Sequence, residues 1–132
     1  MPNIPIEIST ATQDAEEALI GAILVEASDG TKDFVVDISC IVSASDFKDE
    51  LNQQIYKAML NCSEAPHQIN VARKMVELGV LGKYAIAHMS HCISVSPNSM
   101  DYIDFAKAVK YYSELRRSGI PVKSRTYSGF DI

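Results

Sequence analysis

The sequence predicts an all-α fold, a helical globule followed by an antiparallel helical hairpin. Apolar residues recur three and four positions apart in most segments, which is the spacing of one face of an α-helix. Capping residues precede these segments, and glycine follows one of them, as at helix ends. Only residues 33–42 are rich in β-branched residues, and no second segment is available to pair with them as a sheet.

Composition limits the class of protein. The chain has 132 residues, of which 47% are hydrophobic and 22% charged, which suits one soluble globular domain. No stretch approaches about 18 apolar residues, and the start lacks the pattern of a signal peptide, so we expect a cytoplasmic protein. The three cysteines are widely spaced among apolar residues, and we expect buried free thiols at Cys40, Cys62 and Cys92.

The net charge of −5 is unevenly distributed. Residues 1–106 hold six lysines and arginines against 15 acidic residues, whereas residues 107–132 hold six against two. The larger part should therefore repel a phosphate backbone. Only the C-terminal end is suited to contact nucleic acid.

The N-terminal quarter predicts an arm and a buried helix. Residues 1–11 contain two prolines and several β-branched residues, and we expect an extended arm. A helix should begin near Thr12, and the almost wholly apolar run 18–24 places that helix in the centre of the fold. Gly21 indicates close packing against another helix, because glycine costs roughly 1 kcal/mol of helix stability relative to alanine.

The next segment is ambiguous between strand and helix. After a turn at residues 28–31, the β-branched residues of 33–42 favour a strand, yet a lone strand leaves its backbone groups unpaired. We therefore interpret residues 33–40 as a short helix. Ser43 with Asp46 three positions later fits a capping box.

The remainder predicts four helices and a tail. Residues 51–62 form a helix, and Asn70 should cap another that runs to Leu78. Gly79 should end it. Residues 81–93 and 99–117 then form two helices joined by a short turn, so residues 81–117 should be the hairpin. The helical domain spans 12–117, and 118–132 form a flexible basic tail.

No segment carries a catalytic motif. The run 79–84 has two residues between its glycines where a P-loop has four, and tyrosine follows Lys83 where a P-loop has serine or threonine. His88, His91 and Cys92 have the spacing of metal ligands on a helix, but isolated spacing is weak, and we favour a helix face with one buried thiol. We expect no catalytic residue, no cofactor and no metal.

The C-terminal third offers two candidate surfaces. Apolar side chains spread over more than one face of the last helix, so a partner can cover those that the domain does not, although burial of the whole helix within a monomer is the alternative. The candidate interaction residues of the hairpin are Tyr84, Met89, Tyr102, Phe105, Val109 and Tyr112. The candidate nucleic-acid contacts, in and before the basic tail, are Arg116, Arg117, Lys123 and Arg125.

Several segments also follow the order of one family. Residues 14–24 (Asp-Ala-Glu-Glu-Ala-Leu-Ile-Gly-Ala-Ile-Leu) are similar to a Glu-Ala-Glu … Leu-Gly-x-Leu-Leu helix. Residues 42–47 resemble a Leu-x-x-x-Asp-Phe turn, and residues 52–59 a His-x-x-Ile-Phe/Tyr-x-Ala-Ile helix. Ile69-Asn70 and Ser96-Pro97-Asn98 stand where the family has Ile-Asp and a hairpin loop. The last matching residues are Tyr102, Ala106, Val109 and the pair Arg116-Arg117. In this order and spacing the chain resembles the N-terminal domain of DnaB-family replicative DNA helicases.

The resemblance implies a function. In that family the domain is a helical globule and a hairpin, the hairpins pair into dimers that form a collar on the helicase ring, and the domain contacts primase and helicase loaders. By resemblance this chain is a non-catalytic oligomerisation and docking module of the DNA replication machinery, with little or no direct DNA contact and no membrane contact. The alternative is a small nucleic-acid-binding or helicase-regulating protein that uses its basic C-terminal tail.

The sequence departs from the family pattern at several points. Where the family has Gly-Gly-x-x-Tyr-Leu, this chain has Leu-Gly-Lys-Tyr-Ala at residues 81–85. Asn52 replaces the histidine of the His-x-x-Ile helix, and Asn70 replaces the aspartate of the Ile-Asp pair. The motor domain with its Walker motif is absent from these 132 residues, and the segment 118–122 stands where a linker helix is expected. The chain is thus either an excised fragment or a natural stand-alone protein, and the unusual ending 128–132 favours the second.

Overall fold

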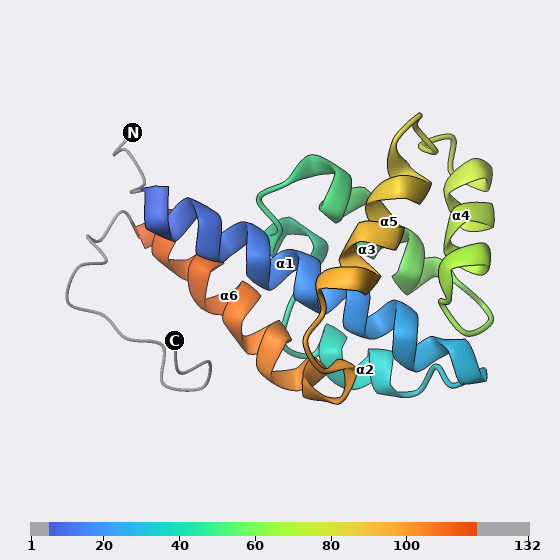
Figure 1. Cartoon of the computed structure of the whole chain (residues 1–132), viewed down its shortest axis with the longest axis horizontal. Helices are drawn as coiled ribbons and strands as arrows, with labels where there is room; N and C mark the ends of the chain where they lie inside the picture. The colour runs from blue at the N-terminus through green and yellow to red at the C-terminus, as the bar shows by residue number, and fades with distance from the viewer. Residues whose placement is uncertain (1–5, 119–132) are drawn as a thin grey trace.

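Six α-helices and three short 3-10 turns build the molecule (Figure 1), for which a computed structural model describes residues 6–118. The helices are α1 (Ile6–Glu26), α2 (Phe34–Ser39), α3 (Glu50–Asn61), α4 (Gln68–Glu77), α5 (Ala85–Val95) and α6 (Tyr102–Ser118). The turns are η1 (Ala27–Asp29), η2 (Ala44–Asp46) and η3 (Ser99–Asp101). No strand occurs between residues 6 and 118, so the all-α prediction is confirmed. None of these helices is long and apolar enough to cross a membrane.

Helix α1 begins earlier than the sequence predicted. It starts at Ile6, so the extended arm is wrong for residues 6–11, while residues 1–5 lie outside the described part. Both prolines precede Ile6 in the sequence and therefore do not interrupt the helix. Thr12 lies inside the helix, where its hydroxyl donates to the Ile8 carbonyl at 2.7 Å instead of capping the first turn.

The ambiguous segment is helical, and the turn after it has the predicted cap. Helix α2 buries Phe34, Val35 and Ile38, which form one side of a short helix against the core. The capping box of η2 is present, and the Ser43 backbone N–H donates to the Asp46 carboxylate at 2.8 Å. Both predictions are confirmed.

Helix α4 has a different cap from the one predicted. It begins at Gln68, and His67 is its N-cap, with the ring Nδ1 3.4 Å from the Asn70 backbone N. Asn70 lies inside the helix, and its side-chain amide donates to the Ala65 carbonyl at 2.8 Å. Gly79 follows with a φ of 72°, a left-handed conformation that ends the helix as predicted.

Helix α1 lies at the centre of the fold. Leu19, Ile20 and Ile23 are fully buried, and α1 packs on both α5 and α6. At Gly21 the contact is so close that a Cβ atom would lie 2.0 Å from the carbonyl oxygen of Cys92 in α5. This confirms that Gly21 marks close helix packing.

The predicted hairpin is not formed by α5 and α6. Both helices pack extensively on α1 but hardly on each other, and they diverge from their connecting loop (Figure 1). The loop is tied to α1, because the Ser96 hydroxyl donates to the Ala18 carbonyl at 3.1 Å and the Ser99 hydroxyl to the Glu26 carboxylate at 2.7 Å. A short loop therefore joins two helices that use different faces of α1, which is apolar nearly all round.

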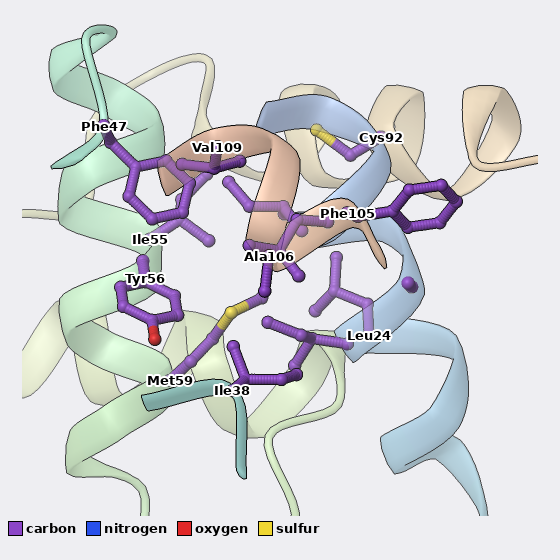
Figure 2. Close-up of a cluster of buried hydrophobic side chains, with 14 of the residues drawn as sticks. Leu24, Ile38, Phe47, Ile55, Tyr56, Met59, Cys92, Phe105, Ala106 and Val109 are labelled. Carbon is purple, nitrogen blue, oxygen red and sulfur yellow. The ribbon is translucent and has the colours of Figure 1, made fainter. Parts of the chain in front are cut away.

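Residues of α2 and α3 form a second layer that completes the core beside α1 and α6. Figure 2 shows Met59 of α3 near Ile38 of α2 in the core, with Met59 extending toward Ala106 of α6. The Tyr56 hydroxyl donates to the Val42 carbonyl at 2.8 Å, so the one polar atom of this buried ring is satisfied.

Candidate functional site

Most of the predicted interaction residues lie inside the domain. Met89 is fully buried, and Phe105, Val109 and Tyr112 are exposed by no more than 4%. Their assignment to a partner-binding surface is therefore wrong. The physical reason is that α1 lies against both α5 and α6 and covers the faces that a hairpin partner was expected to cover.

Two of the six are at least partly accessible. The ring of Tyr102 is half-buried and lies 5.2 Å, centroid to centroid, from Phe34 of α2. Tyr84 is 68% exposed at the start of α5, and the Lys83 ammonium lies 5.5 Å from the centroid of its ring. Of the candidate interaction residues, Tyr84 is thus the one that a partner can reach over most of its surface.

The candidate nucleic-acid contacts separate into two groups. Arg116 donates to the backbone carbonyl of Asp46 at 2.6 Å, and Arg117 donates to the Ser45 carbonyl at 3.1 Å. The structure thus uses both guanidinium groups to hold α6 against η2. Lys123 and Arg125 lie outside the described residues.

Asp46 lies at the centre of these contacts between η2 and α6 and is fully buried. Its carboxylate accepts the Ser113 hydroxyl at 2.7 Å and lies 3.1 Å from Arg117 Nη1 and 3.5 Å from Lys110 Nζ. Desolvation acts to raise its pKa, but hydrogen bonds from Ser43 and Ser113 and the charge of Lys110 together lower it. The carboxylate therefore stays ionised and connects η2 to α6.

A second buried carboxylate connects α1 to α3. Glu16 is fully buried and accepts hydrogen bonds from the backbone N–H of Lys48 at 2.6 Å and of Asp49 at 3.3 Å. The side-chain amide of Asn52 donates to it at 3.0 Å. Burial raises the pKa of Glu16, and these hydrogen bonds oppose that rise. The backbone N–H groups of the two residues that precede α3 are thus satisfied by a carboxylate from another helix.

The candidate metal ligands have partners of their own. His88 Nε2 lies 2.6 Å from Asn52 Oδ1, and His91 Nε2 lies 3.0 Å from Glu17 Oε1. Burial raises the pKa of the Cys92 thiol to about 12, which keeps it protonated and a poor ligand. Within residues 6–118, no group of three or more histidines, cysteines or acids is placed to hold a metal.

The other cysteines differ from the prediction in burial. All three thiols are free, but Cys40 is exposed and Cys62 is only half-buried. Cys40 follows α2 at its C-terminal end, and only three residues of this short helix face the core. Cys62 lines a cleft of about 210 Å³ between the end of α3 and α4, together with charged residues of both signs. That cleft is smaller than most ligand pockets.

Exposed apolar side chains gather in one part of the chain. Of the eleven large hydrophobic residues that are exposed in the described part, six lie between positions 69 and 86, namely Ile69, Val76, Leu78, Leu81, Tyr84 and Ile86. They belong to α4, the loop that follows it and the start of α5. Leu78 is 47% exposed because it lies at the end of α4, next to Gly79.

Sequence reasoning missed this surface except for Tyr84. The signal was present in α4, where two apolar stripes run side by side. Val71 and Met75 form the buried stripe, and Ile69 and Val76, seven positions apart, form a second one. A helix with two apolar stripes can bury one in its own domain and present the other.

Comparisons with known proteins agree on one domain. A family model described as the DnaB-like helicase N terminal domain matches residues 9–111. The crystal structure of the N-terminal domain of DnaB helicase from Mycobacterium tuberculosis is similar, with a TM-score of 0.72 and 23% sequence identity. The match covers 81% of this chain and 77% of that chain, and at this identity it bears on the fold alone. No curated protein matches the chain.

Proposed function

Because the chain belongs to the DnaB-like helicase N-terminal domain family, we propose that it is a non-catalytic oligomerisation and docking module of the DNA replication machinery. The observation that carries the proposal is the family match over residues 9–111, which describes the N-terminal domain of these helicases. The expected partners are copies of the chain itself and the replicative helicase, primase or helicase loader.

The contacts made by the residues that resemble the family support this proposal. Glu16, Asp46 and the pair Arg116-Arg117 carry much of the resemblance, and all of them form contacts inside the domain. They therefore maintain the fold, and the docking function is left to exposed side chains elsewhere in the domain. The exposed apolar residues between positions 69 and 86 are of the kind that partner proteins cover.

A dimer through helices 85–95 and 102–118 is not part of the proposal. The apolar faces of those helices pack against α1, so they are not available for self-association. Tyr84 remains a candidate contact because it is 68% exposed.

The alternative, a nucleic-acid-binding protein that uses the basic C-terminal end, has less support. Arg116 and Arg117 are held by η2, which leaves Lys123 and Arg125 as its candidates. A mobility shift of single-stranded DNA at low salt, lost when residues 119–132 are removed, would favour this alternative over docking.

The docking proposal is tested with the full 132-residue chain. Light scattering measures its oligomeric state, and biolayer interferometry measures binding to the purified helicase, primase and loader of the organism that encodes it. We expect a dimer or larger species, or a complex with at least one of these proteins in the micromolar range or tighter. A chain that stays monomeric at 100 µM, roughly the weak end of specific association, and binds none of the three would refute the proposal.

A further inference from the structure

An apolar surface lies where α4 packs beside α5. The side-chain amide of Gln68 donates to the Ile86 carbonyl at 3.1 Å and to the Ser90 hydroxyl at 2.9 Å, so this side of α4 faces α5. At about 100° per residue, Ile69 and Val76 both lie within about 100° of Gln68 around the helix. Ile86 and Ser90 are one turn apart on α5. Three branched side chains therefore border the same junction.

These side chains are exposed to an unusual degree. Ile69 is 67%, Val76 60% and Ile86 51% accessible. Covering these three side chains would remove their apolar surface from water and so favour association. We call Ile69, Val76 and Ile86, together with Arg73 and Lys83, the α4–α5 surface.

The segment of the chain that contains this surface is richer in cations than the domain as a whole. Between residues 65 and 100 the chain has three cationic residues and one acid, whereas residues 1–106 as a whole carry −9. The acid, Glu77, pairs with Lys74 at 2.7 Å. Arg73 lies four residues after Ile69 and three before Val76, which places it beside both on the helix. Neither Arg73 nor Lys83 forms an ion pair within residues 6–118.

This charge favours a different protein over a second copy. In a two-fold symmetric dimer the same patch meets itself, so the unpaired cations Arg73 and Lys83 would approach their own counterparts. A partner that offers apolar side chains and carboxylates satisfies both features of the surface at once.

We propose that the α4–α5 surface binds an acidic amphipathic helix of a partner protein. Its apolar stripe would cover Ile69, Val76 and Ile86, and its flanking carboxylates would pair with Arg73 and Lys83. This inference rests on the proposed docking function and names the surface and the chemistry of the partner. The surface lies at the opposite end of the described part from the start of α1 and the end of α6 (Figure 1).

The first test uses three synthetic 18-residue peptides and the full chain labelled with ¹⁵N. One peptide has leucines at positions i, i+3, i+4 and i+7 with glutamates elsewhere, the second replaces glutamate by lysine, and the third scatters the leucines. We expect the first to bind at least tenfold more tightly than the others, with NMR shift changes centred on Ile69, Val76 and Ile86. Equal binding of all three, or shift changes centred elsewhere, would overturn the proposal.

Variants separate the apolar and charged contributions. Ile69→Gln with Val76→Gln removes the apolar stripe, and Arg73→Glu with Lys83→Glu reverses the charge; each pair should weaken binding of the first peptide at least tenfold. Val36→Gln on α2 and Lys107→Glu on α6 are exposed controls outside the surface and should leave it unchanged. Circular dichroism verifies folding, and a pair that does not fold is replaced by Ile86→Gln or Arg73→Gln.

The same variants distinguish failure of this inference from failure of the docking function. If the chain binds the helicase, primase or loader and both double variants bind as tightly as the parent, the surface assignment is wrong and the docking function stands. If the chain binds none of the three but binds the acidic peptide as described, the surface assignment stands and the replication role is wrong.

Discussion

The two ends of the molecule use polar and apolar side chains in opposite ways. Where α1, η2, α3 and α6 meet, buried carboxylates of Glu16 and Asp46 are fully hydrogen-bonded and hold helices together. At the α4–α5 surface, apolar side chains are exposed and two cations lack an ion pair in the described residues. The first region contains most of the residues that resemble the family, and the second contains few of them. Most family-like residues therefore identify the scaffold here, and the residues of the α4–α5 surface other than Ile69 lie outside them.

The largest effect is expected at Glu16. Replacing Glu16 by alanine leaves the N–H groups of Lys48 and Asp49 and the amide of Asn52 without their acceptor in a buried site, which should lower the free energy of unfolding by about 3–5 kcal/mol. Urea denaturation measures the change. Glu114→Ala, at an exposed position of α6, is the control and should cost about 0.5 kcal/mol or less. Equal losses would remove the distinction between scaffold and surface.

Gly21 tests how closely the scaffold is packed. An added methyl group would meet the Cys92 carbonyl of α5 at 2.0 Å, so Gly21→Ala should lower the free energy of unfolding by about 3 kcal/mol despite the better helix propensity of alanine. Gly82→Ala is the control, because nothing lies within 4 Å of its added methyl group. Thermal denaturation that shows the same midpoint for both variants would contradict the close approach of α5 to α1.

Asp46 gives the scaffold a pH dependence of defined sign. Its folded-state pKa lies below its ordinary value of 3.8, so its stabilisation is fully present above that pH and is lost as the pH falls through the folded value. Asp46→Asn should cost about 2 kcal/mol at pH 7, with a difference from the parent that narrows below pH 3.8. Urea denaturation across this range measures the difference. Asp37→Asn, on the exposed side of α2, should show neither effect.

The smallest effect on stability is expected at the α4–α5 surface. Ile69→Gln and Val76→Gln change side chains that are already largely exposed, so each should alter the free energy of unfolding by about 0.5 kcal/mol or less. Thermal denaturation of the two variants measures this. A loss above about 2 kcal/mol would mean that these residues belong to the scaffold, and the comparison between the two ends would fail.

Local patterns determined most of the secondary structure. The spacing of apolar residues located five of the six described helices, and the lack of a second strand decided for a helix at residues 33–40. The Ser43–Asp46 pair identified the capping box of η2. The early start of α1 and the cap of α4 by His67 were missed. Thr12 and Asn70 are both of residue types that favour the N-cap, and only the surrounding chain decides that they lie inside helices instead.

The sequence by itself determined that this chain is helical, that α1 is buried and that Gly21 sits at a close helix contact. Only the tertiary structure decided which helix covers which face. Periodicity shows that α5 and α6 each have an apolar side, but it does not say that α1 fills both. For the same reason Phe105 and Val109 became core residues, and Arg116 and Arg117 became partners of η2, while Ile69 and Val76 remained at the surface. Burial depends on contacts between segments far apart in the sequence, and no local pattern encodes which segments will meet.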